Sequence, residues 1–254
     1  MDVKIFGERN TATTALKMLI ERNSLSRVVP SIARELDPNF DQAMHSFGDT
    51  LEDQRLREAY VDRIFRSTRP RFAWKHASTK FEDASDFKNC LVVFSVRHPA
   101  SWLLALHRRP YRALQPTPVD FEKFVVTQWQ TTWRDRMGQR AITPIDLYSE
   151  KLRSYITFAS QITNMGAAVV TIRHEVTATN QYSAYNILRP LLSSPVADPI
   201  IATTSTNDPA KSIKFYKSYY GENKWRAEIG NGALKKINEL FDWTVARLFD
   251  YFPI

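Results

Sequence analysis

Cysteine, glycine and long hydrophobic runs are scarce in this chain of 254 residues. Its one cysteine, Cys90, excludes an internal disulfide and a cysteine metal cluster, and its place beside an apolar run predicts a buried thiol. No apolar run is long enough to span a bilayer, and a predicted strand starts at once without a signal-peptide pattern. We therefore expect a cytoplasmic protein that does not enter a membrane.

The composition is otherwise that of an ordinary folded protein with a basic excess. Hydrophobic residues make up 43% and charged residues 24%, so the chain can build a sizeable core. Its length suits a single α/β domain over residues 1–254 with a lid. The 35 Lys and Arg against 27 Asp and Glu give a net charge of +8. This charge favours polyanionic ligands, among them nucleotides, sulfated sugars, nucleic acid and acidic membranes, without choosing among them.

Residues 3–16 are the most informative stretch, because they predict a strand, a tight loop and a helix in succession. Residues 3–6 are mostly apolar and β-prone. Gly7 follows, and its backbone freedom suits the exit from a strand. A helix that begins between Thr11 and Thr13 would direct its free N–H groups and its dipole at the loop. That arrangement predicts a site for a phosphate or a sulfate group.

An arginine fork and several hydroxyl groups in this loop would add to the backbone donors. The loop lacks the second glycine and the following Lys-Ser/Thr of a Walker nucleoside-triphosphate loop. The predicted anion-binding residues are Arg9, Asn10, Thr11, Ala12, Thr13 and Thr14.

Two later segments also place chemically capable side chains at predicted strand ends. Residues 71–78 predict a strand with Lys75 and His76 at its end, and residues 90–96 predict a buried strand that runs into Arg97. In open α/β sheets, ligands bind outside the carboxyl ends of the strands. We therefore expect the first loop and these three side chains to face the same side of the sheet.

These features in this order resemble the sulfotransferases that use 3′-phosphoadenosine-5′-phosphosulfate (PAPS). The arrangement Gly-x-Arg-Asn-x-x-Thr-Thr-x-Leu resembles the 5′-phosphosulfate loop of heparan-sulfate-type enzymes and a bacterial Gly-Glu-Arg-Asn-x-Gly-Thr variant. Trp-Lys-His resembles the Lys-x-His of the cytosolic enzymes, and Arg-His-Pro resembles the 3′-phosphate motif. The resemblance covers the first half of the chain well and the rest loosely. It implies a P-loop-like three-layer α/β fold, with a central parallel sheet flanked by helices and a helical lid.

The resemblance also implies roles for the side chains at the strand ends. His76 would take the proton from the acceptor, as a group with a reference pKa of about 6.5 can do near neutral pH. Lys75 would neutralise charge on the transferring sulfuryl group. Arg97 would hold the 3′-phosphate, for which a bidentate guanidinium is well suited. No metal is required by this scheme.

The sequence departs from the family pattern at two of these places. The family serine eight residues after the arginine is Ala105 here, so Ser101 would substitute for it as a donor. Asn10 stands where many members have a loop lysine. By the resemblance, Arg9, Lys75 or Lys17 would compensate for that lysine.

The segment 107–146 is basic and aromatic, and three interpretations of it stay open. It could be a lid over the acceptor, with Arg108, Arg109 and Arg112 meeting an acidic substrate or the donor. Basic residues beside aromatic ones also describe a nucleic-acid surface. A helical subdomain with a small core of its own is the third interpretation.

Helices are predicted over residues 50–65, 145–155 and 234–249 from their apolar spacing. Residues 167–173 predict a further buried strand, and residues 176–210 an irregular connection.

By the resemblance, two later sites would also contact the donor. His174 directly follows the strand predicted over residues 167–173, and it would stack on the adenine. The basic stretch with Lys214 and Lys217 would correspond to the late loop of the family that closes over the 3′-phosphate.

The sequence therefore predicts a sulfotransferase that transfers the sulfuryl group from PAPS by in-line displacement and releases adenosine 3′,5′-bisphosphate (PAP). The acceptor would be a hydroxyl or amine of a small molecule or carbohydrate; which one, and the oligomeric state, the sequence leaves open. One alternative is an atypical P-loop kinase. The other is a non-catalytic basic protein that binds nucleic acid or glycan, although nucleic acid is not the partner we expect.

Overall fold

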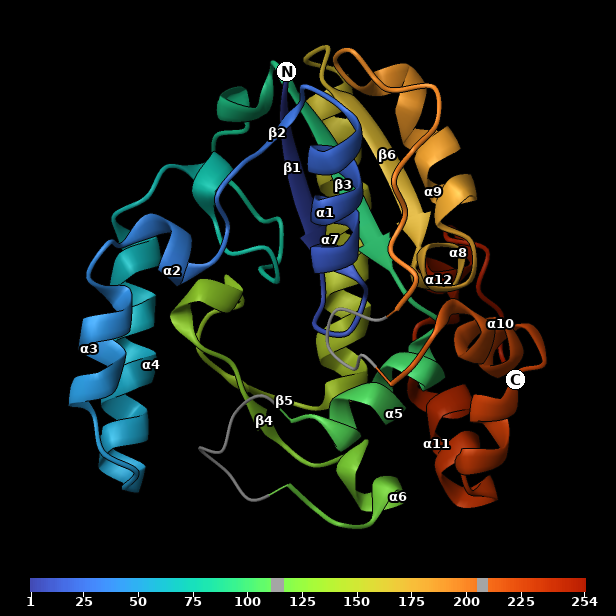
Figure 1. Ribbon diagram of the computed structural model, residues 1–254. Coiled ribbons are helices and arrows are strands. Elements are labelled where there is room, and N and C mark those ends of the chain that lie inside the picture. The colour runs from blue at the N-terminus through green and yellow to red at the C-terminus, as the bar shows by residue number, and fades with distance from the viewer. Residues whose placement is uncertain (111–116, 205–209) are drawn as a thin grey trace.

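A parallel four-stranded sheet forms the centre of the computed structural model, which describes residues 1–110, 117–204 and 210–254 (Figure 1). The strand order is β2-β1-β3-β6. β1 and β3 pair in parallel from Asp2 opposite Cys90 to Gly7 opposite Ser95. The three strands predicted at 3–6, 90–96 and 167–173 are confirmed. The burial predicted for the third is wrong, because β6 lies at the edge of the sheet and Ile172 is its one buried residue. The bounds are β1 (Asp2–Gly7), β2 (Arg27–Val28), β3 (Cys90–Val96) and β6 (Ala168–Arg173).

Helices cover both faces of this sheet, and its central strand β3 is accordingly buried along its whole length. Val3 and Ile5 of β1 pack with α1 (Thr13–Asn23) and α9 (Gln181–Leu188). Phe6 packs into the larger core on the opposite face. Figure 1 shows α1 in front of the sheet and α7 behind it. The α/β class with a parallel sheet between two helical layers agrees with the prediction. The helices that contribute to the larger core include α5 (Pro99–Arg108), α7 (Pro144–Thr163), α11 (Asn231–Leu240) and α12 (Trp243–Arg247).

The connection from β1 to β3 includes an arm of helices that projects beside the sheet (Figure 1). It consists of α2 (Ala33–Leu36), α3 (Phe40–Ser46) and α4 (Leu51–Arg66). The predicted helix over 50–65 is α4, whose first turn is fixed by a capping box between Thr50 and Asp53. Within the described ranges, no helix combines the length and apolarity that crossing a bilayer requires.

The described part of segment 107–146 contains the end of α5, α6 (Phe121–Phe124) and a two-stranded antiparallel ribbon. The ribbon pairs β4 (Trp129–Gln130) with β5 (Ala141–Ile142), and a 3₁₀ turn lies between them at Trp133–Asp135. Phe124 belongs to the main core. Arg112 lies outside the described residues.

The strand predicted over 71–78 is wrong. Pro70 starts a 3₁₀ helix at Pro70–Phe72, and turns follow it. The backbone approaches β1 at one point, where the Gly7 N–H donates to the Lys75 carbonyl over 2.9 Å. Lys75 and His76 therefore do reach the end of β1, but on a loop.

Two other expectations about secondary structure need correction. The connection predicted over 176–210 contains α8 (His174–Thr179), α9 and a 3₁₀ helix at Arg189–Leu191, because its apolar residues pack on α1 and β6. α10 (Ile213–Gly221) follows. The single helix predicted over 234–249 is two helices, since Phe241 is extended and Asp242 caps α12. The buried thiol of Cys90 is confirmed.

Candidate functional site

The loop after β1 has the backbone of an anion-binding corner. Asn10 and Ala12 both adopt left-handed backbone angles, with φ of 64° and 66°. Ala12 precedes α1, and no side chain caps the first turn of that helix. The first N–H groups of a helix have no acceptor within it. They can therefore bind an anion held by the loop.

Gly7 is required for close approach rather than for its backbone angles. Its φ is not among the positive ones, but a Cβ atom there would lie 2.5 Å from the Ser95 carbonyl oxygen. The same Cβ would lie 2.7 Å from the Thr11 hydroxyl oxygen. The glycine lets the loop fold back onto β3, which corrects the reason expected from the sequence.

Arg97, at the end of β3, contacts this loop directly. Its Nη1 donates to the Asn10 carbonyl and its Nε to the Ser101 hydroxyl, both over 2.9 Å. The Tyr148 hydroxyl lies 2.8 Å from both the N–H and the carbonyl of Arg97. The structure thus brings the two predicted corners together, with Ser101 beside Arg97.

A cavity of about 410 Å³ opens beside these corners. This volume lies in the range of small-molecule and cofactor sites. Asn10, Ala12, Arg97 and His174 form one wall, and aromatic rings of α10 form the other. The remaining cationic side chains at its wall are Arg108, Arg109 and Lys211. Arg108 pairs there with Glu228, so its charge is already neutralised.

His174 begins α8 and is buried at the wall of this cavity. Its Nε2 lies 2.9 Å from the Tyr220 hydroxyl. Burial, with a further contribution from Arg97, lowers the pKa of His174 well below its usual value. The ring is therefore neutral at pH 7.

Lys214 and Lys217 lie on α10 with exposed side chains, and neither lines the cavity. The same helix turns Tyr216 and Tyr220 toward the cavity instead. The structure does not bring these two lysines together with Arg97.

Lys75 lies beside the loop after β1, residues 8–12, which we call the anion loop after the site predicted there. Its Nζ is 3.3 Å from the Thr14 hydroxyl. Burial lowers the pKa of Lys75, and Lys17 contributes to the same effect. Lys17 is itself paired with Glu35. Of the two lysines expected to compensate for Asn10, Lys75 is therefore the better placed.

His76 is held by the end of β1. Its Nδ1 hydrogen-bonds the Gly7 carbonyl, which can only accept, so Nδ1 carries the proton. Burial first, then Lys75 and Arg9, lowers the pKa of His76 well below its usual value. The neutral ring therefore has an unprotonated Nε2, as a general base needs.

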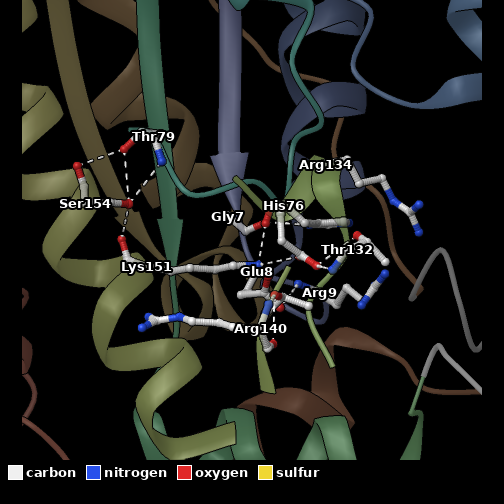
Figure 2. Close-up of polar contacts among 12 residues, drawn as sticks. Gly7, Glu8, Arg9, His76, Thr79, Thr132, Arg134, Arg140, Lys151 and Ser154 are labelled. Carbon is white, nitrogen blue, oxygen red and sulfur yellow. Dashed lines mark hydrogen bonds and ion pairs between the residues drawn. The ribbon is translucent and has the colours of Figure 1, made fainter. Parts of the chain in front are cut away.

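Arg9 lies on the same flank as His76. Its guanidinium stands 4.7 Å from the ring centre of Trp74, whose indole also contacts the His76 ring edge-on at 5.1 Å. Arg134 packs over the same Trp74 ring at 4.9 Å. Figure 2 shows Arg9 and Arg134 beside the His76 segment.

A buried charge cluster beneath His76 was not predicted. Lys151 of α7 pairs with Glu8, with Asp135 Oδ1 at 3.2 Å and with the His76 carbonyl at 2.7 Å (Figure 2). Lys151 is 1% exposed and Glu8 2%. The available signal was a lysine on the apolar stripe of a helix, which needs a buried partner.

No three or more His, Cys, Asp or Glu side chains in the described part of the chain are grouped to hold a metal ion. Comparison of the sequence with protein-family models and with curated proteins gave no match.

Proposed function

We propose that this protein is a PAPS-dependent sulfotransferase with a P-loop-like fold. One observation carries the proposal: the Arg97 guanidinium donates to the Asn10 carbonyl, so the corners after β1 and β3 share one cavity. A nucleotide with phosphate groups at both its 5′ and 3′ positions needs two such anion sites at one cavity. The loop and the start of α1 would hold the 5′-phosphosulfate, and Arg97 with Ser101 the 3′-phosphate.

The backbone of the loop and the charge of Arg97 support this donor. Ala12 and Asn10 give the loop the curvature of an anion-binding nest. Arg97 has hydroxyl and carbonyl partners and, among the described residues, no carboxylate within ion-pair distance. Its charge is thus available to a phosphate.

The chemical step would be an in-line displacement at sulfur. The acceptor oxygen or nitrogen forms the new bond to sulfur while the bond from sulfur to the 5′-phosphate oxygen breaks. The acceptor proton passes to Nε2 of His76, and PAP leaves with the bonding electron pair. Arg9 and Lys75 lie at this flank of the loop and would stabilise the spread negative charge.

Several finer features belong to the same proposal. Coverage of the acceptor by segment 107–146 stays a prediction. Contacts of Lys214 and Lys217 with the donor, and residence in the cytoplasm, stay predictions.

Titration calorimetry with PAP tests the donor site. We expect wild type to bind PAP and Arg97→Ala to bind at least about tenfold more weakly, on the order of 1.4 kcal/mol. Arg153→Ala is the control, because Arg153 is half exposed and lies outside the cavity. Unchanged affinity in Arg97→Ala would remove Arg97 from the site.

Turnover of radiolabelled PAPS with a panel of hydroxyl and amine acceptors tests the base. His76→Ala should keep PAP binding and lose turnover by roughly 10²- to 10⁴-fold. Turnover of ATP with Mg²⁺ in place of PAPS would favour a kinase instead. Salt-dependent binding of heparin without PAP binding would favour the polyanion-binding alternative.

A further inference from the structure

Two fully buried lysines, Lys4 and Lys151, contact the segment that carries His76. Lys4 is 0% exposed and Lys151 is 1% exposed. They come from different elements, β1 and α7, yet each donates from Nζ to a backbone carbonyl of the same segment. Lys4 donates to Ala73, and Lys151 to His76. Burial of an ammonium group is costly, so the contacts made by these groups need a structural reason.

The segment between these two carbonyls is not part of the sheet. Its backbone bonds are few: the Gly7 N–H donates to the Lys75 carbonyl, the Lys75 N–H to the Ser31 carbonyl over 3.1 Å, and the Ala77 N–H to the Trp74 carbonyl over 2.9 Å. The two lysines supply hydrogen bonds that strand pairing would otherwise supply. The place of the His76 ring therefore depends on two side chains from elsewhere in the fold.

Lys151 also connects this segment to the anion loop. Its ammonium pairs with Glu8, and Oε2 of the same carboxylate accepts from the Arg9 N–H over 3.3 Å. One buried ammonium group thus contacts the loop and the His76 carbonyl together. Figure 2 shows Lys151 reaching from α7 to Glu8 between these two parts.

We propose that Lys4 and Lys151 are positioning residues for His76. Together with the Ala73 and His76 carbonyls they form a lysine clamp, which keeps the imidazole against the Gly7 carbonyl with Nε2 unprotonated. That Nε2 accepts a proton in catalysis rests on the proposed function. The clamp rests only on the contacts of Lys4 and Lys151 and does not depend on that function.

Loss of the clamp has a defined effect on the His76 ring. The charged groups that face the ring are Arg9, Lys75 and Lys151, and all three disfavour the imidazolium. Glu8 and Asp135 pair with Lys151. A released segment would gain water and lose one of these cations. Added water and a lost cation each raise the pKa of His76. The neutral ring would then carry its proton on Nδ1 in some molecules and on Nε2 in others.

Long-range ¹H–¹⁵N NMR of histidine-labelled protein tests the clamp, with His76→Gln to assign the signal. In wild type we expect a neutral ring protonated at Nδ1 throughout neutral pH. In Lys151→Met the ring should populate both tautomers and titrate at a higher pH. Turnover should fall at least about tenfold. Lys80→Met, the same substitution at an exposed lysine, is the control.

Lys4→Met provides the second variant if Lys151→Met does not fold. No carboxylate within the described ranges pairs with Lys4, so its replacement leaves no unpaired buried charge. The same change of tautomer in Lys4→Met supports the clamp. A folded Lys4→Met or Lys151→Met with the wild-type tautomer and pKa at His76 overturns it. Absence of PAP binding in wild type, with the NMR changes as expected, would contradict the proposed function alone.

Discussion

Arg97 and Lys151 are two buried cations at opposite flanks of the anion loop, and they are neutralised in different ways. Lys151 pairs with two carboxylates, Glu8 and Asp135. Arg97 contacts a carbonyl and a hydroxyl, and no carboxylate of the described residues. A cation whose charge is balanced within the protein can serve structure, whereas one that is left unbalanced beside a cavity can bind an anion.

The largest expected difference between the two flanks is in the unfolding free energies of Lys151→Met and Arg97→Met. Lys151→Met removes the cation that pairs with the buried Glu8 and Asp135 carboxylates, and it should cost about 3–5 kcal/mol of unfolding free energy. Among the described residues, no carboxylate pairs with Arg97. Arg97→Met should therefore cost only about 1–2 kcal/mol of unfolding free energy, from its lost hydrogen bonds. Urea unfolding measures both. An equal loss of unfolding free energy in the two variants would mean that the charges of Lys151 and Arg97 are neutralised to the same extent within the protein.

The histidines on the two flanks predict how stability depends on pH. His76 and His174 are both buried, and burial followed by nearby cations lowers the pKa of each well below its usual value. The native rings stay neutral, while the unfolded chain takes up protons near pH 6.5. The unfolded state therefore binds more protons, and stability falls as pH drops below about 6.5.

Each ring should contribute a slope that grows from about half to nearly all of about 1.4 kcal/mol per pH unit as the pH falls from about 6.5 to about 5. Denaturation between pH 5 and 7 should show the slope reduced by this amount in His76→Gln and in His174→Gln. An unchanged slope in either variant would show that its ring is protonated in the native protein.

Two tyrosines of α7 sharpen the comparison between the flanks. The Tyr148 hydroxyl contacts both backbone polar groups of Arg97. The buried Tyr155 hydroxyl, on the Glu8 flank, has no hydrogen-bond partner among the described residues. Tyr148→Phe should cost about 1–3 kcal/mol of unfolding free energy, because it leaves the buried backbone N–H and carbonyl of Arg97 without this hydrogen-bond partner. Tyr155→Phe should leave the unfolding free energy nearly unchanged. Thermal unfolding of the pair checks this, and a costly Tyr155→Phe would contradict it.

The smallest effect is expected at Ala12, where the anion loop meets the cavity. Ala12 holds a left-handed conformation that glycine adopts without strain. Ala12→Gly should therefore stabilise the protein by about 0.5–1 kcal/mol. Ala15→Gly is the matched control inside α1 and should destabilise it by a similar amount. Destabilisation by both would mean that the loop does not keep this conformation in solution.

Much of the frame was predictable from the sequence, because it depends on local pattern. The apolar run at 90–96 predicted β3, and the alternation of loop and helix after β1 predicted α1. Arg97 was predicted beside the first loop from the rule that parallel strands end on one side of a sheet.

The remainder depended on contacts that local pattern does not encode. Residues 71–78 have the composition of a strand, but Lys4 and Lys151 bond its carbonyls from far along the chain. The pairing of Lys151 with Glu8 joins residues 143 positions apart. A carboxylate directly after a buried strand and a lysine on an apolar stripe each predict a buried partner, but not which one.

The central claim is that Arg97 and the loop after β1 hold the two phosphate-bearing ends of one nucleotide. Calorimetry with PAP and with adenosine 5′-monophosphate, which lacks the 3′-phosphate, tests it on wild type and Arg97→Ala. Wild type should prefer PAP by at least about tenfold, and in Arg97→Ala the two affinities should agree within about threefold. A preference for PAP that survives the substitution, or no PAP binding to wild type, would contradict the claim.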